Sequence, residues 1–349
     1  MKGLRLSADV AQGLRTVAVA GSGALVFLAL GIPAGAVLGG MTATAAASLA
    51  GVRLGFPKTW RAPQLAIMGL AAGATVTPAT LAAAGLWPGS LLVLLIGTVA
   101  IHGLAYWLFR RLTGADRLTS YFATAPGSLS AIMVLAEDHD CDLPRIAVTQ
   151  TLRVVILLGL APLALSGAGG AAPQGADPGW LQGAAAWGVL AAACVVGWGL
   201  ARRLGWPIPA FLGVMLGSAI LHATNLVGVH PPAWLLSLSM AALGGVIGAR
   251  FSGLGPRDVA GYLPGAFATL AASLAVAAPL GWIVGTTVGV GSTAGLIAFA
   301  PGSMEVMIAV SIALGAQPTY VACHHVARTL FLLATVPAIA RRLPLDRRT

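Results

Sequence analysis

Long apolar stretches separated by short polar loops recur along most of the chain. Ten of them approach the roughly 20 residues that a helix needs to cross the hydrocarbon of a bilayer. None alternates polar and apolar residues like a strand of a transmembrane barrel. The pattern predicts an all-α polytopic membrane protein. The predicted spans are residues 14–31, 33–51, 63–84, 87–109, 146–166, 181–201, 208–228, 233–252, 260–287 and 318–340.

Two apolar segments are interrupted by the same Pro-Gly-Ser break. FATAPGSLSAIM occupies residues 122–133 and AFAPGSMEVMIA occupies residues 298–309. Non-helical backbone at membrane depth is tolerated only where protein buries it or water lines it. We therefore predict two re-entrant or broken-helix segments, at about residues 117–136 and 292–315, each between the fourth and fifth span of its set.

The two halves of the chain are copies of each other. Ala125 matches Ala300 and Arg153 matches Arg328, both 175 residues apart, and Gln150 aligns with His325. We predict a first repeat at residues 1–166, a linker rich in Gly, Ala and Pro at 167–180, and a second repeat at 181–349. Each repeat would hold five transmembrane helices and one re-entrant segment.

Composition and charge support this topology. Only 9% of the residues are charged, and the net charge of +10 is spread over short loops without the dense basic stripe of a nucleic-acid-binding protein. If the two segments dip in and return, all basic residues except Arg153 and Arg328 fall on one side, which the positive-inside rule assigns to the cytoplasm. Five crossings per repeat then invert the second repeat and place both termini in the cytoplasm, in a bacterial-type inner membrane. Inverted repeats with interrupted helices are typical of secondary transporters.

Candidate substrate-binding residues gather around the two breaks. Prolines and glycines suit a helix start that a ligand approaches closely, and serines beside a helix N-terminus favour anions. Buried arginines are usually paired or functional. The candidates are Pro126, Gly127, Ser128, Ser130, Gln150, Arg153, Pro301, Gly302, Ser303, Glu305, His325 and Arg328.

Alternative roles remain open for the charged candidates. Arg153 and Arg328 are counter-charges for a solute, or they hold the re-entrant carbonyls in place. Glu305 carries a coupling proton or, in the reading we favour, pairs with Arg328. A proline kink cushioned by packing is the alternative for each break.

Other polar residues suggest no catalytic or metal site. EDHDCD at 137–142 lacks the glycine and distal glutamate of a calcium-binding loop, so we expect a solvated acidic turn. The three cysteines have no metal-ligand spacing. For His102, His222 and Asn225 we expect local hydrogen bonds.

The duplicated APGS tips, each followed by Gln/His-x-x-Arg (VTQTLR at 148–153 and CHHVAR at 323–328), and the IPAG and IPAF helix starts resemble the AbrB family of membrane proteins. That family differs from the DNA-binding regulator of the same name. The resemblance covers nearly the whole chain. It implies a link to regulation of gene expression, and members also carry a monooxygenase label.

The favoured hypothesis is a secondary transporter of a small anionic organic solute, working by alternating access around two opposed tips. The expected partners are that solute and the lipid bilayer, without direct nucleic-acid contact; a homodimer is left open. We expect no cofactor and no enzyme activity, with Na⁺ or H⁺ as the coupling ion. The alternatives are a membrane protein that regulates gene expression indirectly, as a metabolite sensor or exporter, and a membrane monooxygenase.

Overall fold

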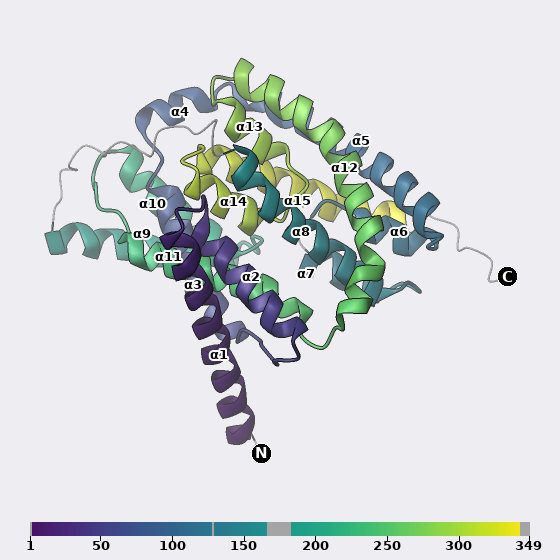
Figure 1. Cartoon of the computed structure of the whole chain (residues 1–349). Helices are drawn as coiled ribbons and strands as arrows, with labels where there is room; N and C mark the ends of the chain where they lie inside the picture. The colour runs from purple at the N-terminus through teal and green to yellow at the C-terminus, as the bar shows by residue number, and fades with distance from the viewer. Residues whose placement is uncertain (1, 128, 166–182, 343–349) are drawn as a thin grey trace. The chain divides into compact units, whose positions relative to one another are not determined.

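The computed structural model describes residues 2–127, 129–165 and 183–342, which form α-helices joined by short loops (Figure 1). The first half contains α1 (Lys2–Ala29), α2 (Gly35–Leu49), α3 (Lys58–Gly73), α4 (Pro78–Ala84), α5 (Trp87–Thr113), α6 (Arg117–Thr124), α7 (Leu129–Glu137) and α8 (Leu143–Leu165). The second half contains α9 (Gly183–Arg203), α10 (Pro209–Ala223), α11 (Ala233–Gly248), the 3₁₀ turn η2 (Ala249–Phe251), α12 (Pro256–Thr287), α13 (Ser292–Phe299), α14 (Met304–Ala313) and α15 (Pro318–Ala340).

Seven helices in the described part of the chain are long and apolar enough to cross a membrane, or up to eight if α3 and α4 count as one bent span. This confirms an all-α polytopic membrane protein. The expectation of one straight span at 63–84 is wrong, because α3 and α4 meet at 88°. Pro78 starts α4, and the Thr77 hydroxyl caps it by accepting from Thr80 N, which ends one helix and begins another.

The expected spans at 33–51 and 208–228 are shorter than predicted. Both α2 and α10 contain 15 residues, which corresponds to about 22 Å. Each begins at the Ile-Pro-Ala motif, where Ala34 (φ 55°) and Ile208 (φ 48°) adopt left-handed backbone. That conformation cannot extend a right-handed helix, so the helices start two or three residues later than the apolar stretch.

The helices form two compact units, and each unit takes helices from both halves of the sequence. The first unit holds α1–α4, α9–α11 and the end of α14. The second unit holds α5–α8, α12, α13, the start of α14, and α15. The repeats at 1–166 and 181–349 therefore interleave rather than fold as separate bodies.

Within the first unit the two halves make equivalent contacts. Gly73 on α3 lies against the backbone of Met215 on α10, and Gly248 on α11 lies against the backbone of Met41 on α2. Gly73 and Gly248 are equivalent by the repeat, and so are Met41 and Met215. The close approach explains the glycines, since a Cβ on either would collide with main chain.

One pair of equivalent residues meets directly. Gln64 and Ser239 are 175 residues apart, and they exchange hydrogen bonds, from Gln64 Nε2 to Ser239 O (3.2 Å) and from Ser239 Oγ to Gln64 O (2.7 Å). Self-complementary contact between equivalent positions is the signature of a two-fold relation. The α3–α11 contact therefore lies where an internal two-fold axis would pass.

Substituting Gly248 tests this packing. Gly248→Ala should destabilise the protein by about 1–3 kcal/mol through overpacking, because its Cβ would meet Thr44 Oγ1 and backbone atoms of Met41 and Ala45. Gly188→Ala on α9 meets nothing within 4 Å and should stabilise by up to about 1 kcal/mol through helix propensity. Thermal unfolding in detergent should lower the midpoint only for Gly248→Ala; equal midpoints would contradict the close approach.

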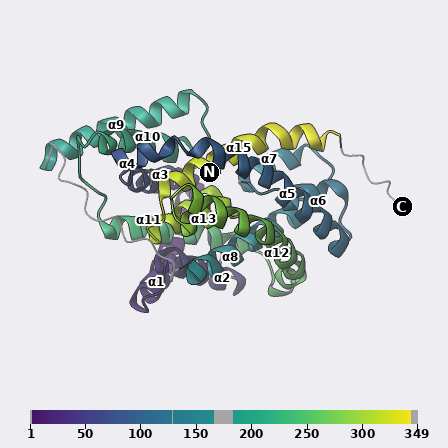
Figure 2. The ribbon, with the colours of Figure 1, turned by 90° about the horizontal axis from the view of Figure 1, so that it is seen from above.

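In the second unit α12 runs alongside α5 and also contacts α13 and α8 (Figures 1 and 2). Gly281 and Gly285 of α12 pack directly on Gly295 of α13. A buried cluster that includes Phe109, Phe122 and Ile146 joins α5, α6 and α8. These helices form the scaffold around both Pro-Gly-Ser breaks.

Candidate functional site

The first break is a helical hairpin. Asp142 N, just after α7, donates to Thr119 Oγ1 in the first turn of α6 (2.8 Å), and the rings of Phe122 and His139 lie 5.3 Å apart. The chain therefore leaves α7 close to where it entered α6. A hairpin with both flanks at one end has the geometry expected of a re-entrant segment.

The second break lies between Phe299 and Met304, where α13 ends and α14 begins. Pro301, Gly302 and Ser303 are buried. Pro126 is also buried and Gly127 is half-buried. Ser128 lies outside the described residues, and of Ser130 only the helical backbone in α7 is described.

Each tip packs against the long helix that follows the other tip. A Cβ on Gly127 would lie 3.4 Å from Leu332 Cδ1 of α15, and a Cβ on Gly302 would lie 2.9 Å from Leu157 Cδ2 of α8. Leu157 and Leu332 are equivalent by the repeat. The two tips thus exchange partners within the second unit, as a two-fold relation requires.

The proline of each tip leaves one carbonyl without its helical donor. In a continuous helix the amides of residues 126 and 301 would donate to Phe122 O and Ile297 O, but proline has no amide hydrogen. Gln150 Nε2 donates to Phe122 O instead (2.7 Å), and His325 Nε2 donates to Ile297 O (3.1 Å). These side chains on α8 and α15 replace the missing amides.

The arginines perform the same task one turn later. Arg153 Nη1 and Nη2 donate to Thr124 O and Ala125 O (both 3.1 Å), at the end of α6. Arg328 Nη2 donates to Ala298 O (2.8 Å), and Nη1 donates to Ala300 O (2.8 Å), at the end of α13. The C-terminal ends of both half-helices, which carry partial negative charge, are thereby held by a guanidinium group.

His325 is neutral in this arrangement. Its Nε2 donates to a carbonyl, so Nδ1 is free to accept from Arg328 Nη2 (3.2 Å). This tautomer is inferred from the hydrogen-bond pattern. A proton on Nδ1 would face the guanidinium group, and His325 therefore serves as a hydrogen-bonding partner.

The expected ion pair between Glu305 and Arg328 is absent from the described residues. The Arg328 hydrogen bonds go to carbonyls at the end of α13 and to His325. Glu305 lies half-buried in the first turn of α14, where the helix dipole favours a carboxylate. The two residues serve opposite helix ends.

Both arginines are buried, with 3% and 2% of Arg153 and Arg328 exposed. Their guanidinium groups are near enough for their charges to repel. Neither forms an ion pair with a carboxylate in the described part of the chain. Arg153 Nε and Thr149 Oγ1, one turn apart on α8, are buried without a hydrogen-bond partner among the described residues. The tips are therefore surrounded by uncompensated positive charge.

Gly302 tests how closely its tip is packed. Its Cβ would meet Met307 and Leu157 side-chain atoms at 2.8–2.9 Å, whereas the Cβ of Gly127 has its nearest neighbour at 3.4 Å. Gly302→Ala should therefore lower stability by about 1 kcal/mol or more, and Gly127→Ala should be nearly neutral. Thermal midpoints of the two variants measure this difference; equal losses would contradict the asymmetry.

The residues outside the tips behave as local structure. His102 Nε2 donates to Tyr121 O (2.9 Å), and His222 donates through Nε2 to Val229 O (3.0 Å), which confirms the expected local hydrogen bonds for both. Asn225 adopts left-handed backbone (φ 54°) just after α10.

The acidic turn at 137–142 is largely exposed, and the described residues contain no group of three His, Cys, Asp or Glu placed to hold a metal ion. Burial, with help from nearby Asp116, Asp140 and Asp142, raises the pKa of the Cys141 thiol to about 11. Cys141 is therefore a poor nucleophile at neutral pH.

Sequence reasoning missed Gln64, Ser239 and Thr149. Gln64 and Ser239 obey the repeat spacing, so a search for polar pairs at that spacing could have found them. Thr149 carried no such signal, because its equivalent position holds His324, whose Nε2 is hydrogen-bonded to Ser90 Oγ (2.8 Å).

Fold and site together define a multi-pass α-helical membrane protein with two broken helices held by buried arginines. The family described as "Transition state regulatory protein AbrB" matches residues 36–344, and the chain belongs to this family. It is 26% identical over 319 residues to "Putative regulator AbrB" of Escherichia coli (strain K12), covering 90% of this chain and 91% of that protein. It is 27% identical over 279 residues to "Uncharacterized protein YhjN" of Bacillus subtilis (strain 168), covering 73% and 70%. No solved structure matches the chain.

Proposed function

We propose that the protein is a secondary transporter of a small anionic organic solute, which binds where the two tips approach each other. The observation that carries the proposal is the pair of buried guanidinium groups without a carboxylate partner in the described part of the chain. An arginine at membrane depth costs at least about 2.5–3.5 kcal/mol. A bound anion would compensate this charge.

The helix ends around the tips favour the same sign of ligand. Arg153 and Arg328 occupy the C-terminal ends of α6 and α13. The N-terminal ends of α7 and α14 keep their free amides and partial positive charge, which suit a carboxylate. The solute would therefore contact Pro126, Gly127 and the serines of the first tip, and Pro301, Gly302 and Ser303 of the second. The arginines act mainly through position and charge.

Transport would follow from movement of one unit around this site. Glu305 lies in the first turn of α14 beside the second tip. We assign it the coupling proton, with Na⁺ as the alternative coupling ion. Protonation of Glu305 would remove a negative charge that competes with an anionic solute.

The proposed topology is five crossings and one re-entrant hairpin per repeat, with the second repeat inverted and both termini in the cytoplasm of a bacterial-type cell. The hairpin geometry of α6 and α7 and the reciprocal packing of Gly127 and Gly302 support it.

Single cysteines on both flanks of each tip test this topology in a chain whose three native cysteines are serine. Leu112→Cys and Asp138→Cys should react with an impermeant maleimide only from the cytoplasmic side, and Thr287→Cys and Ala313→Cys only from the opposite side. Opposite labelling of the two flanks of one tip would mean that the segment crosses the membrane.

Binding itself can be screened in detergent. A solute that binds the folded state raises its stability by about 2.7 kcal/mol at 100 times Kd. Small mono- and dicarboxylates should raise the thermal midpoint where matched neutral amides do not. Stabilisation by the amides alone would count against an anion site.

The name of the Escherichia coli relative favours a second candidate, a membrane protein that regulates gene expression indirectly. Both roles are compatible if the regulator acts by moving a metabolite. A transcript change that survives replacement of Arg153 and Arg328 would separate regulation from transport.

A further inference from the structure

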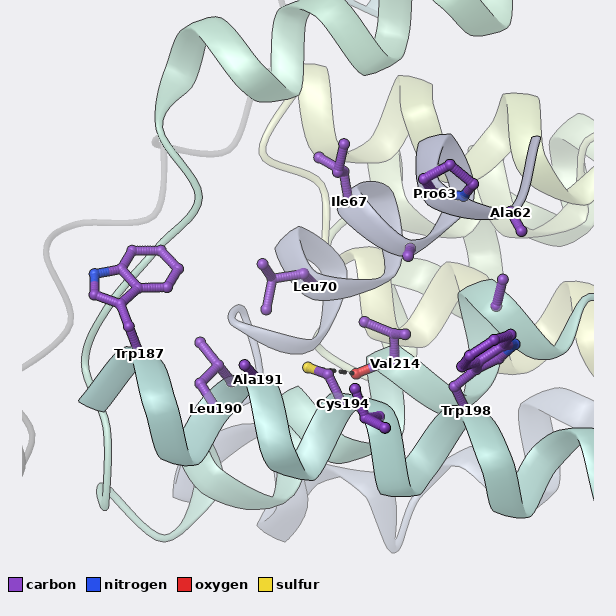
Figure 3. A pocket seen from close by; sticks show the side chains of 13 residues that line it. Ala62, Pro63, Ile67, Leu70, Trp187, Leu190, Ala191, Cys194, Trp198 and Val214 are labelled. Carbon is purple, nitrogen blue, oxygen red and sulfur yellow. Dashed lines mark hydrogen bonds between the residues drawn. The ribbon is translucent and has the colours of Figure 1, made fainter. Parts of the chain in front are cut away.

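An apolar groove runs along the first unit between α3, α9 and α10 (Figure 3). Its volume is about 460 Å³, within the roughly 300–1,000 Å³ typical of ligand sites. None of its thirteen lining side chains carries a charge. Its wall includes Ile67 and Leu70 from α3, Leu190 and Cys194 from α9, and Val214 from α10.

The groove has the length of one leaflet. Trp187 and Trp198, 40% and 37% exposed, stand toward its two ends on α9 (Figure 3). The eleven residues between their positions correspond to about 16 Å along the helix. Half of the bilayer hydrocarbon is about 15 Å thick. A single acyl chain of one leaflet therefore fits along the groove.

One end of the groove is basic. Trp198 lies at the same end as Ala62 and Pro63 (Figure 3), where α3 begins and α9 ends. Lys58 and Arg61 belong to that first turn of α3, and Arg202 and Arg203 to the last turn of α9. Lys58, Arg202 and Arg203 are exposed and Arg61 is half-buried.

This positive charge has little internal compensation. In the described part of the first unit Asp9 on α1 is the only acidic residue, and no ion pair joins the four basic residues to described carboxylates. A second copy of the chain on this groove would bring the same cations to the contact, and like charges are unfavourable there. An anionic lipid headgroup complements the charge.

We infer that the groove binds one acyl chain of an anionic phospholipid whose headgroup lies against Lys58, Arg61, Arg202 and Arg203. Trp198 marks the level of the headgroup, since tryptophan favours the membrane interface. The basic end belongs to the side that the topology above assigns to the cytoplasm. The lipid would therefore come from the inner leaflet. This site is separate from the solute site at the tips.

Full-length protein in mild detergent, titrated with phosphatidylglycerol or phosphatidylcholine of identical acyl chains, tests the inference. Bound lipid is counted by native mass spectrometry and the thermal midpoint is recorded. The wild type should bind one phosphatidylglycerol with a strong preference over phosphatidylcholine. The double variant Arg202→Gln/Arg203→Gln should lose about 30-fold of that preference, the effect of about two surface cations. Arg341→Gln/Arg342→Gln, an exposed pair after α15, should leave it unchanged.

Filling the groove gives the second arm. Ala191→Trp should abolish binding of both lipids, and phosphatidylglycerol should slow alkylation of Cys194 in the wild type by a lipid-soluble maleimide. Equal binding of the two lipids by the wild type would overturn the headgroup assignment. A lipid-free dimer that Ala191→Trp dissociates would show that a second copy occupies the groove and would overturn the inference.

Discussion

Arg328→Met is expected to destabilise the protein by about 3–5 kcal/mol, because it leaves buried carbonyls without donors. The guanidinium group donates to Ala298 O, Phe299 O and Ala300 O at the end of α13. Each unsatisfied buried acceptor costs about 1–3 kcal/mol, and relief from burying a charge offsets only part of that total. The second tip should therefore lose its fixed position.

Graded variants separate the hydrogen bonds from the charge. Arg328→Lys keeps the charge but lacks the planar fork that reaches several carbonyls, so its loss should be intermediate. Arg153→Met should cost less than Arg328→Met, since Arg153 serves two carbonyls. Exposed Arg342→Met is the control. Size-exclusion profiles and thermal midpoints measure the series; an Arg328→Met protein as stable as the wild type would refute the role assigned to this arginine.

Glu305→Gln is expected to abolish proton-driven accumulation of the solute while leaving exchange across the membrane intact. A glutamine keeps the size and position of the side chain in the first turn of α14 but carries no titrating proton. Without coupling, the solute should only equilibrate, to an inside-to-outside ratio of about one.

The matched control is Glu137→Gln, an exposed carboxylate at the end of α7. It should accumulate solute like the wild type in proteoliposomes with an imposed pH gradient. If Glu305→Gln still accumulates the solute under a pH gradient, another group carries the proton. If only a sodium gradient drives uptake in the wild type, the coupling ion is Na⁺.

The sequence predicted the breaks and their arginines because the repeat and the composition record them. Proline in an apolar stretch removes a backbone donor, and the residues that replace it, Gln150 and His325, recur at the matching place on the next helix. Local chemistry and one spacing were sufficient for these features.

Other features depend on tertiary contacts that the sequence pattern does not record. The Glu305–Arg328 pair was a reasonable expectation from charge alone, but it ignored the carbonyls at the end of α13, which bind Arg328 in its place. The bend between α3 and α4 depends on the Thr77 cap inside an otherwise apolar stretch. The interleaving of both halves in two units arises from packing between distant helices.

The most direct test of the solute site is uptake into proteoliposomes containing the purified protein. Radiolabelled small carboxylates, screened with proton or sodium gradients, should include one that is taken up saturably and exchanged against the same unlabelled solute. Ser303→Leu, which blocks the second tip, should remove that uptake, and Gly188→Ala on the open face of α9 should retain it. Absence of flux for every carboxylate with either gradient, from protein that is folded and correctly labelled at its tips, would contradict the transporter assignment.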